Sequence, residues 1–281
     1  MEIYYQRNEI QAAAREARKE GRRIAWVPSL GALHDGHRLQ IEKARDVADW
    51  VVVSAFLDPE EFGTNEDFDQ YPRVPDEDKA LCEEMGVDAL YFPKVEELYP
   101  EGRHSTYVEE FRVASGLCGI SRSTHFRGVA TTFVKLAQLL APDLVVFSRH
   151  KIQRLGVIRR VVRDLFLPIE VVETPVAREP DGLASDARNR YLNDSQRGEA
   201  AQIYRALQAG KRILEEGNTS VDRITAEVIN QLRLSRRLHV LYAHVVDPEN
   251  LNLVRDIKPG ETLLCAGVLI DQIRLVDHVV L

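Results

Sequence analysis

Apolar and polar positions follow two alternating patterns along the first 175 residues. Short, nearly continuous apolar runs, typical of strands covered on both faces, occur at 23–28, 50–57, 89–92, 144–147 and 169–172. Apolar residues at helical spacing fill the intervals, at 8–20, 39–48, 75–85, 128–140 and 151–166. Strands and helices that alternate in this way predict an α/β protein with a Rossmann-like, doubly wound parallel sheet.

The pattern changes after the turn residues 180–182. Two helices are expected at about 194–216 and 220–233, followed by alternating runs at 239–246 and 262–280. Such runs predict a small antiparallel sheet. We therefore expect a Rossmann-like domain over 1–175 and a smaller α+β C-terminal domain over 176–281.

The stretch from Pro28 to His37 carries the strongest chemical signal in the chain. It joins a predicted strand to a predicted helix, and Gly31 and Gly36 would let the backbone approach a ligand closely. Backbone N–H groups and the positive end of the helix dipole favour phosphate at such a turn. His34 and His37, three residues apart, can face one bound group. The residues alone leave open that the two histidines only cap or pack against the helix start.

Composition excludes several other functions. A net charge of -7 and an isoelectric point near 5.7 argue against a nucleic-acid-binding surface. No apolar run approaches 18 residues and no signal peptide is evident, so we expect a cytoplasmic protein without a membrane span. Cys82, Cys118 and Cys265 are widely spaced, which predicts reduced thiols and no metal site.

Other candidate positions carry less weight. The acidic stretch 77–84 is expected to be a solvated helix face. His104 and His125 precede a loop and a helix, and His125 with Arg127 is expected to shape a binding site.

Motifs spread over the whole chain resemble those of pantothenate synthetases, a family of nucleotidyltransferases with a His-x-Gly-His signature. They comprise the turn 27–37, Phe62-Gly63, Tyr71-Pro72-Arg73, 117–119, 125–131, 157–160, 181–184 and 188–192. The resemblance implies that ATP adenylates a small carboxylic acid, with release of pyrophosphate, and that an amine then displaces AMP. It also implies Mg²⁺ as a cofactor and a homodimer.

The resemblance assigns roles to individual residues. His34, His37, His150 and Arg188 stand at the catalytic positions. The nucleotide-binding positions hold Leu30, Gly31, Leu33, His34, His37, Lys151, Val176, Asp186 and Arg188. The positions that bind the acid hold Leu30, Glu61, Arg127 and Arg154.

Several of these residues differ from the family pattern on the acid side. The family has Met at the position of Leu30, Gln at Glu61 and a second Gln at Arg154. One carboxylate and one guanidinium suit a zwitterion, such as an amino acid, better than pantoate. Alternatively, Glu61 and Arg154 pair with each other and close the pocket, since a buried charge without a counter-charge is costly.

The nucleotide side also differs. The family's Lys and Asp after the fourth strand are His150 and Lys151, and its two serines before Arg188 are Asp186 and Ala187. Imidazole is only partly cationic near neutral pH. We therefore expect an adenylate-forming ligase with a changed acid or amine. Pantothenate synthetase itself, acting on pantoate and β-alanine, is the alternative, and a catalytically silent relative that binds a ligand or partner is a third possibility.

Overall fold

The computed structural model describes residues 1–63, 66–102 and 105–281, so His104 lies outside the described part. The chain forms two compact units. The first contains 1–110, 122–149 and 157–175, and the second contains 111–121, 150–156 and 176–281. Segments 111–121 and 150–156 thus belong with the later residues, and the division into domains at 175 stays a prediction.

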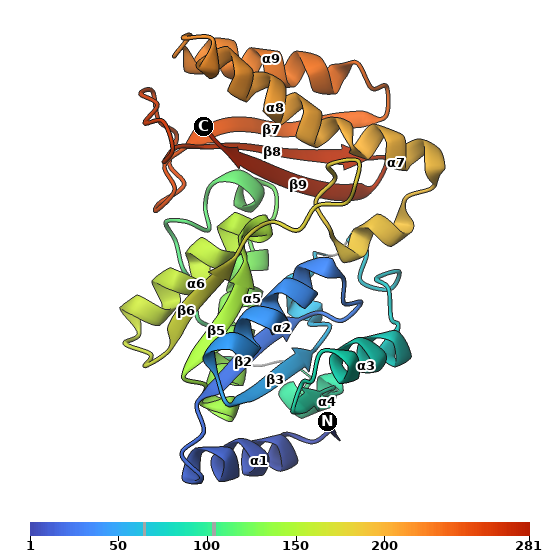
Figure 1. The fold of residues 1–281 in the computed structure, drawn as a ribbon, viewed down its shortest axis with the longest axis vertical. Helices are drawn as coiled ribbons and strands as arrows, with labels where there is room; N and C mark the ends of the chain where they lie inside the picture. Colours follow the sequence, from blue (N-terminus) through green and yellow to red (C-terminus); the bar gives the residue numbers. More distant parts are fainter. Residues whose placement is uncertain (64–65, 103–104) are drawn as a thin grey trace. The chain divides into compact units, whose positions relative to one another are not determined.

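A six-stranded parallel sheet organises the first unit (Figure 1). Its order is β1-β4-β3-β2-β5-β6. The strands are β1 (Glu2–Tyr4), β2 (Ile24–Ser29), β3 (Trp50–Ala55), β4 (Ala89–Tyr91), β5 (Leu144–Ser148) and β6 (Glu170–Thr174). The helices are α1 (Arg7–Lys19), α2 (Asp35–Val47), α3 (Pro75–Glu84), α4 (Val95–Leu98), α5 (His125–Leu140) and α6 (Ile152–Asp164), with short 3₁₀ turns η1 (Pro59–Glu61) and η3 (Arg149–Lys151). Residues 150–156, which include the end of η3 and the beginning of α6, belong to the second unit.

Both faces of the central strands are covered, which explains their continuous apolar runs. One face packs with Ile41 and Ala44 of α2 and Cys82 of α3. On the opposite face the Trp26 ring stacks on Phe133 of α5, with ring centroids 5.3 Å apart, and its indole N–H donates to Ser54 Oγ at 2.8 Å. The expected Rossmann-like, doubly wound parallel sheet is confirmed.

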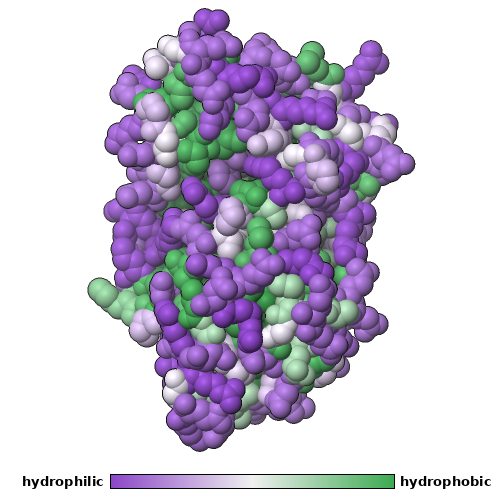
Figure 2. Space-filling view, viewed as in Figure 1, coloured by the Kyte–Doolittle hydropathy of each residue, from purple (hydrophilic) through white to green (hydrophobic). Residues whose placement is uncertain are grey.

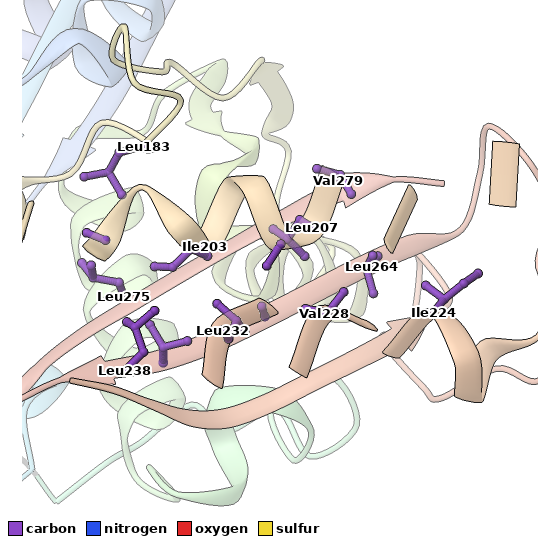
Figure 3. Close-up of a cluster of buried hydrophobic side chains, with 14 of the residues drawn as sticks. Leu183, Ile203, Leu207, Ile224, Val228, Leu232, Leu238, Leu264, Leu275 and Val279 are labelled. Atoms are coloured by element: carbon purple, nitrogen blue, oxygen red, sulfur yellow. The ribbon is translucent and has the colours of Figure 1, made fainter. Parts of the chain in front are cut away.

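The second unit contains the antiparallel sheet β7-β8-β9, formed by Leu238–Val246, Leu263–Ile270 and Ile273–Val280. Helices α8 (Gln202–Glu215) and α9 (Val221–Arg233) place Leu207 and Val228 against Leu264 of β8 (Figure 3). Gly210 allows this approach, because a Cβ there would lie 2.7 Å from Val228 Cγ2. Segment 111–121, with η2 (Leu117–Ile120), also belongs to this unit.

The single helix expected at 194–216 is wrong in one respect, because it is divided into α7 (Asp194–Ala200) and α8. The segment before α7 forms a hairpin over 178–184, in which Arg178 and Ala184 pair in an antiparallel bridge. Arg197 of α7 donates to Glu179 and Asp181 in this hairpin. That ion-pair group ties α7 to the hairpin, whereas α8 packs its apolar face on the sheet. The pattern of apolar residues runs through both helices and does not reveal the break.

The face drawn in Figure 2 is mainly hydrophilic, with apolar groups scattered among polar ones. This agrees with a charged fraction of 29%. Within the described residues, no helix has the length and apolar character needed to cross a bilayer.

Candidate active site

Strands β2 and β5 are neighbours at the point where the strand order reverses. The chain adds β3 and β4 on one side of β2, and β5 and β6 on the other. Ligands of open α/β sheets bind beyond the carboxyl ends of the strands at such a position. The chain leaves β2 through the histidine turn and leaves β5 into η3, which contains His150 and Lys151.

His34 and His37 form a reciprocal cap at the start of α2. Nδ1 of His34 accepts the Gly36 N–H at 3.2 Å, and Nδ1 of His37 accepts the His34 N–H at 3.3 Å. Their ring centroids are 4.2 Å apart, at an interplanar angle of 66°. The capping role considered from the sequence is therefore real.

Capping does not exclude ligand binding by these two side chains. A neutral imidazole that accepts a hydrogen bond at Nδ1 carries its proton on Nε2. Both His34 and His37 are thereby set in the tautomer whose Nε2–H can donate to an oxygen anion. The cap orients the two rings, and the same geometry supplies two donors at the positive end of a helix.

Asp78 is a residue of the site that the sequence pattern does not reveal. The stretch 77–84 was expected to be solvated, yet Asp78 is only 2% exposed. Its carboxylate accepts the N–H groups of Ala32 and Leu33 in the histidine turn, at 3.0 and 2.7 Å. Cys82, one helical turn further along α3, is also buried, and this i, i+4 pair is the pattern that could have revealed the buried face.

Glu61 ends η1 and is buried, with 5% of the residue exposed. Its backbone carbonyl accepts from Arg122 Nη2 at 3.1 Å and from His125 Nδ1 at 2.7 Å. Arg122 is itself paired with Glu66. Helix α5 comes close to the turn at Gly128, where a Cβ would lie 2.3 Å from the Glu60 carbonyl oxygen. These contacts fix the backbone that carries the Glu61 carboxylate.

Asp58 anchors the beginning of the same turn. Its fully buried carboxylate accepts the Glu60 N–H at 2.9 Å, the Tyr99 hydroxyl at 2.6 Å and the Thr132 hydroxyl. Burial raises the pKa of Asp58, although the three hydrogen bonds oppose the shift. Arg127, also expected to shape the site, lies with its guanidinium 4.5 Å from the ring centroid of Tyr107.

The second unit brings four predicted site residues together around one carboxylate. Nε2 of His150 lies 3.0 Å from Oδ2 of Asp186, and Lys151 Nζ donates to the same oxygen. The other oxygen, Oδ1, accepts the Arg188 N–H at 2.9 Å, and this caps the 3₁₀ turn η4 (Ala187–Tyr191). His150 and Asp186 are both buried, and Lys151 is partly exposed.

Burial and charge set the protonation of this group. Burial, together with the positive charge of Lys151, lowers the pKa of His150. The pKa of Asp186 lies well below its usual value, because Lys151 and the hydrogen bond from His150 outweigh the effect of burial. Asp186 is therefore an anion beside a neutral imidazole, and His150 donates from Nε2.

An ion pair between the partly buried Arg178 and the buried Asp277 supports the segment that carries Asp186 and Arg188. Arg178 donates to both carboxylate oxygens of Asp277 on β9, at 2.7 and 2.9 Å, and lies 3.9 Å from the ring centroid of Tyr204. Val176 and Arg154 also belong to the second unit, whereas Leu30, Glu61 and Arg127 belong to the first. The pairing of Glu61 with Arg154 stays a prediction.

Magnesium was expected from the family resemblance. Over the residues described here, no three His, Cys, Asp or Glu side chains gather in a way that could hold a metal ion. Mg²⁺ in enzymes that use nucleotides is held largely by substrate phosphates and one or two carboxylates. Among these residues, the chain therefore offers no complete metal cage of its own.

A six-stranded parallel sheet, with an imidazole pair at the start of the helix that follows strand β2, defines an α/β protein of the Rossmann-like class. Within that class, the pantoate-beta-alanine ligase profile matches residues 2–280. The chain belongs to this family of carbon–nitrogen ligases.

Individual relatives agree over the whole length. Pantothenate synthetases of a Sulfurihydrogenibium species and of Thermosipho africanus are 41% and 38% identical, each alignment covering 99% or more of both chains. The crystal structure of pantothenate synthetase from Thermus thermophilus matches with a TM-score of 0.93 at 36% identity, over 99% of both chains. A Francisella tularensis pantoate-beta-alanine ligase, complexed with beta-gamma ATP and beta-alanine, matches with a TM-score of 0.81 at 25% identity, over 100% of this chain and 97% of its own.

Proposed function

We propose that this protein joins pantoate to β-alanine at the expense of ATP, through an acyl-adenylate. Family membership over residues 2–280 supports the reaction type, and the Francisella tularensis relative supports ATP and β-alanine as substrates. The observation in this chain that carries the proposal is the histidine pair, whose caps set both Nε2 atoms as donors at the start of α2.

In the first step, a carboxylate oxygen of pantoate attacks the α-phosphorus of ATP. The bond from the α-phosphorus to the bridging oxygen breaks, and pyrophosphate leaves. Negative charge grows on that leaving oxygen, and the Nε2–H groups of His34 and His37 stabilise it. Arg188 and Lys151 contribute positive charge to the phosphates, while Leu30, Gly31, Leu33 and Val176 contact the nucleotide.

In the second step, the neutral amine of β-alanine attacks the acyl carbon of the adenylate. The new carbon–nitrogen bond forms, the bond to the AMP oxygen breaks, and the amine loses a proton. The mixed anhydride is sensitive to water, so the acid site must exclude solvent. Arg127, Glu61 and Arg154 are the residues that we assign to the acid.

A second candidate is the same reaction with a different acid. The buried Glu61 carboxylate favours it, because a carboxylate repels the carboxylate of pantoate and attracts a substrate that also carries an ammonium group. An α-amino or β-amino acid would supply that charge.

A pyrophosphate-release assay with ATP tests both candidates. Pantoate and β-alanine should give pyrophosphate, AMP and a product with the mass of pantothenate. Turnover when an amino acid replaces pantoate as the acid, together with no turnover on pantoate, would overturn the first candidate in favour of the second. Absence of pyrophosphate with every acid would contradict both and favour a silent, ligand-binding relative.

A homodimer and Mg²⁺ accompanying ATP are the parts of the proposal that come from the family resemblance. A cytoplasmic location, and a nucleotide- and acid-binding domain over 1–175 with a C-terminal domain over 176–281, come from the pattern of the sequence. Light scattering on the purified protein would measure the mass, and a mass of one chain across micromolar concentrations would contradict the dimer.

A further inference from the structure

The histidine turn has an unusual backbone that needs external support. Gly31 and Ala32 both have positive φ, 87° and 51°, and Ala32 adopts it at a steric cost that glycine avoids. Successive N–H groups of this turn point toward side chains. Ser29 Oγ accepts from Gly31 at 2.9 Å, and the next two N–H groups donate to Asp78.

The Asp78 carboxylate binds this backbone through both of its oxygens. Oδ2 accepts from Ala32 and Oδ1 from Leu33, so each oxygen fixes one amide. Hydrogen bonds to an ionised oxygen are stronger than those between neutral groups, and a buried carboxylate needs them. The fit is close, because a Cβ on Gly31 would lie 3.3 Å from Oδ2.

We propose that Asp78 is the positioning residue of the histidine turn. It holds the backbone in the left-handed conformation from which the His34–His37 cap follows, and so it orients both imidazoles. A second consequence concerns nucleotide binding. The N–H groups of Ala32 and Leu33 donate to Asp78 and are therefore not the groups that bind phosphate. The donors that this turn presents to phosphate are the Nε2–H groups of the two imidazoles. The catalytic part of this inference rests on the proposed function.

The test compares Asp78→Asn with Asp76→Asn, a control in the same helix whose side chain is 96% exposed. In Asp78→Asn the amide presents an NH₂ group to one of the two N–H donors. Amide hydrogen exchange measured by NMR should lose protection at Ala32 and Leu33 by at least tenfold, with the rest of β2 unchanged. In the ligase assay, kcat/KM for ATP should fall about 100-fold, while KM for β-alanine stays within twofold. Asp76→Asn should leave all of these values unchanged.

A second variant tests the contact from the other side. Gly31→Ala retains Asp78 but forces a Cβ toward its Oδ2 and strains the positive φ. Gly31→Ala should reproduce the loss of amide protection and the kinetic change. It can replace Asp78→Asn in the test if that variant does not fold. Lost protection with unchanged ATP kinetics would overturn the positioning role, and so would retained protection in a folded Asp78→Asn.

The readouts separate this inference from the proposed function. If the unmodified protein releases no pyrophosphate with pantoate, the proposed function fails. The positioning role is then judged by amide exchange and by the ¹³C shifts of the His34 and His37 rings. Ring shifts that stay the same in Asp78→Asn would overturn it, and shifts that change together with lost protection would support it.

Discussion

His150 donates from Nε2 to Oδ2 of Asp186 over 3.0 Å, and both side chains are almost completely buried. A neutral imidazole beside an ionised carboxylate makes folding sensitive to acid. The folded protein resists protonating His150, whose pKa is lowered, whereas the unfolded chain takes up the proton near the ordinary value of 6.5. Since the unfolded state then binds more protons, stability falls as the pH drops below about 6.5.

We predict that His150→Gln removes part of this pH dependence. One proton contributes a slope of at most about 1.4 kcal/mol per pH unit to the free energy of unfolding. Urea unfolding at pH 7.5, 6.5 and 5.5 should show a shallower fall in His150→Gln than in the unmodified protein. His239→Gln, at an exposed position of β7, is the matched control and should keep the original slope. Parallel slopes in all three proteins would contradict the neutral state of His150.

Asp186→Asn is expected to strengthen ATP binding. The amide oxygen can still accept the Arg188 N–H and cap η4, but the negative charge that holds Lys151 is gone. Lys151 can then contribute its full charge to phosphate, so Kd for ATP at low salt should fall by roughly tenfold, or about 1.4 kcal/mol. Calorimetric titration measures Kd. The control is Asp222→Asn, at an exposed position of α9, which should not change Kd. Weaker ATP binding by Asp186→Asn would instead indicate that the Asp186 carboxylate itself helps to bind the nucleotide.

His34→Asn separates capping from ligand binding. Asn is a strong N-cap residue, so α2 should still begin at the same position. The free energy of unfolding should stay within about 1 kcal/mol of that of the unmodified protein. The imidazole donor is lost, and kcat/KM for ATP should fall by about 10²–10³. A folded variant with normal activity would mean that His34 serves the helix alone.

Glu61→Gln combined with Arg154→Gln restores the amides found in the family at these positions. If the charges set the choice of acid, KM for pantoate should fall by about tenfold, because the carboxylate no longer repels the substrate. Glu60→Gln in the same 3₁₀ turn is the control for a nearby change of charge. An unchanged or higher KM for pantoate would count against the assignment of Glu61 to the acid site.

Gly128→Ala should destabilise the first unit by about 1–3 kcal/mol, because the new Cβ would lie 2.3 Å from the Glu60 carbonyl oxygen. Gly198→Ala on α7 is a useful comparison, since no atom lies within 4 Å of the added Cβ and alanine favours a helix. Chemical unfolding should therefore shift in opposite directions for the two variants. If the two variants changed the free energy of unfolding equally, η1 would be able to move away from α5 at little cost in stability.

The sequence predicted the fold well, because covered parallel strands and amphipathic helices have distinct periods. It missed the three-residue strand β1, which is too short to show a period, and the break between α7 and α8. At the site, the His34–His37 pair was visible because Gly31 precedes it and Gly36 lies within it. Asp78 was not, since one buried acid in the acidic stretch 77–84 looks like its solvated neighbours until the backbone contacts are known. The Lys151–Asp186 contact joins segments 35 residues apart, and composition carries no trace of it.

The position of β2 in the sheet has a consequence for synthesis of the protein. β2 pairs with β3, which follows it closely, and with β5, which begins at Leu144. Until β5 emerges from the ribosome, one edge of this largely apolar strand has no hydrogen-bonding partner from the sheet. Bare strand edges of this kind recruit other chains. Truncated products that end within α5 should therefore aggregate, and slow translation just before residue 144 would lower the yield of folded enzyme.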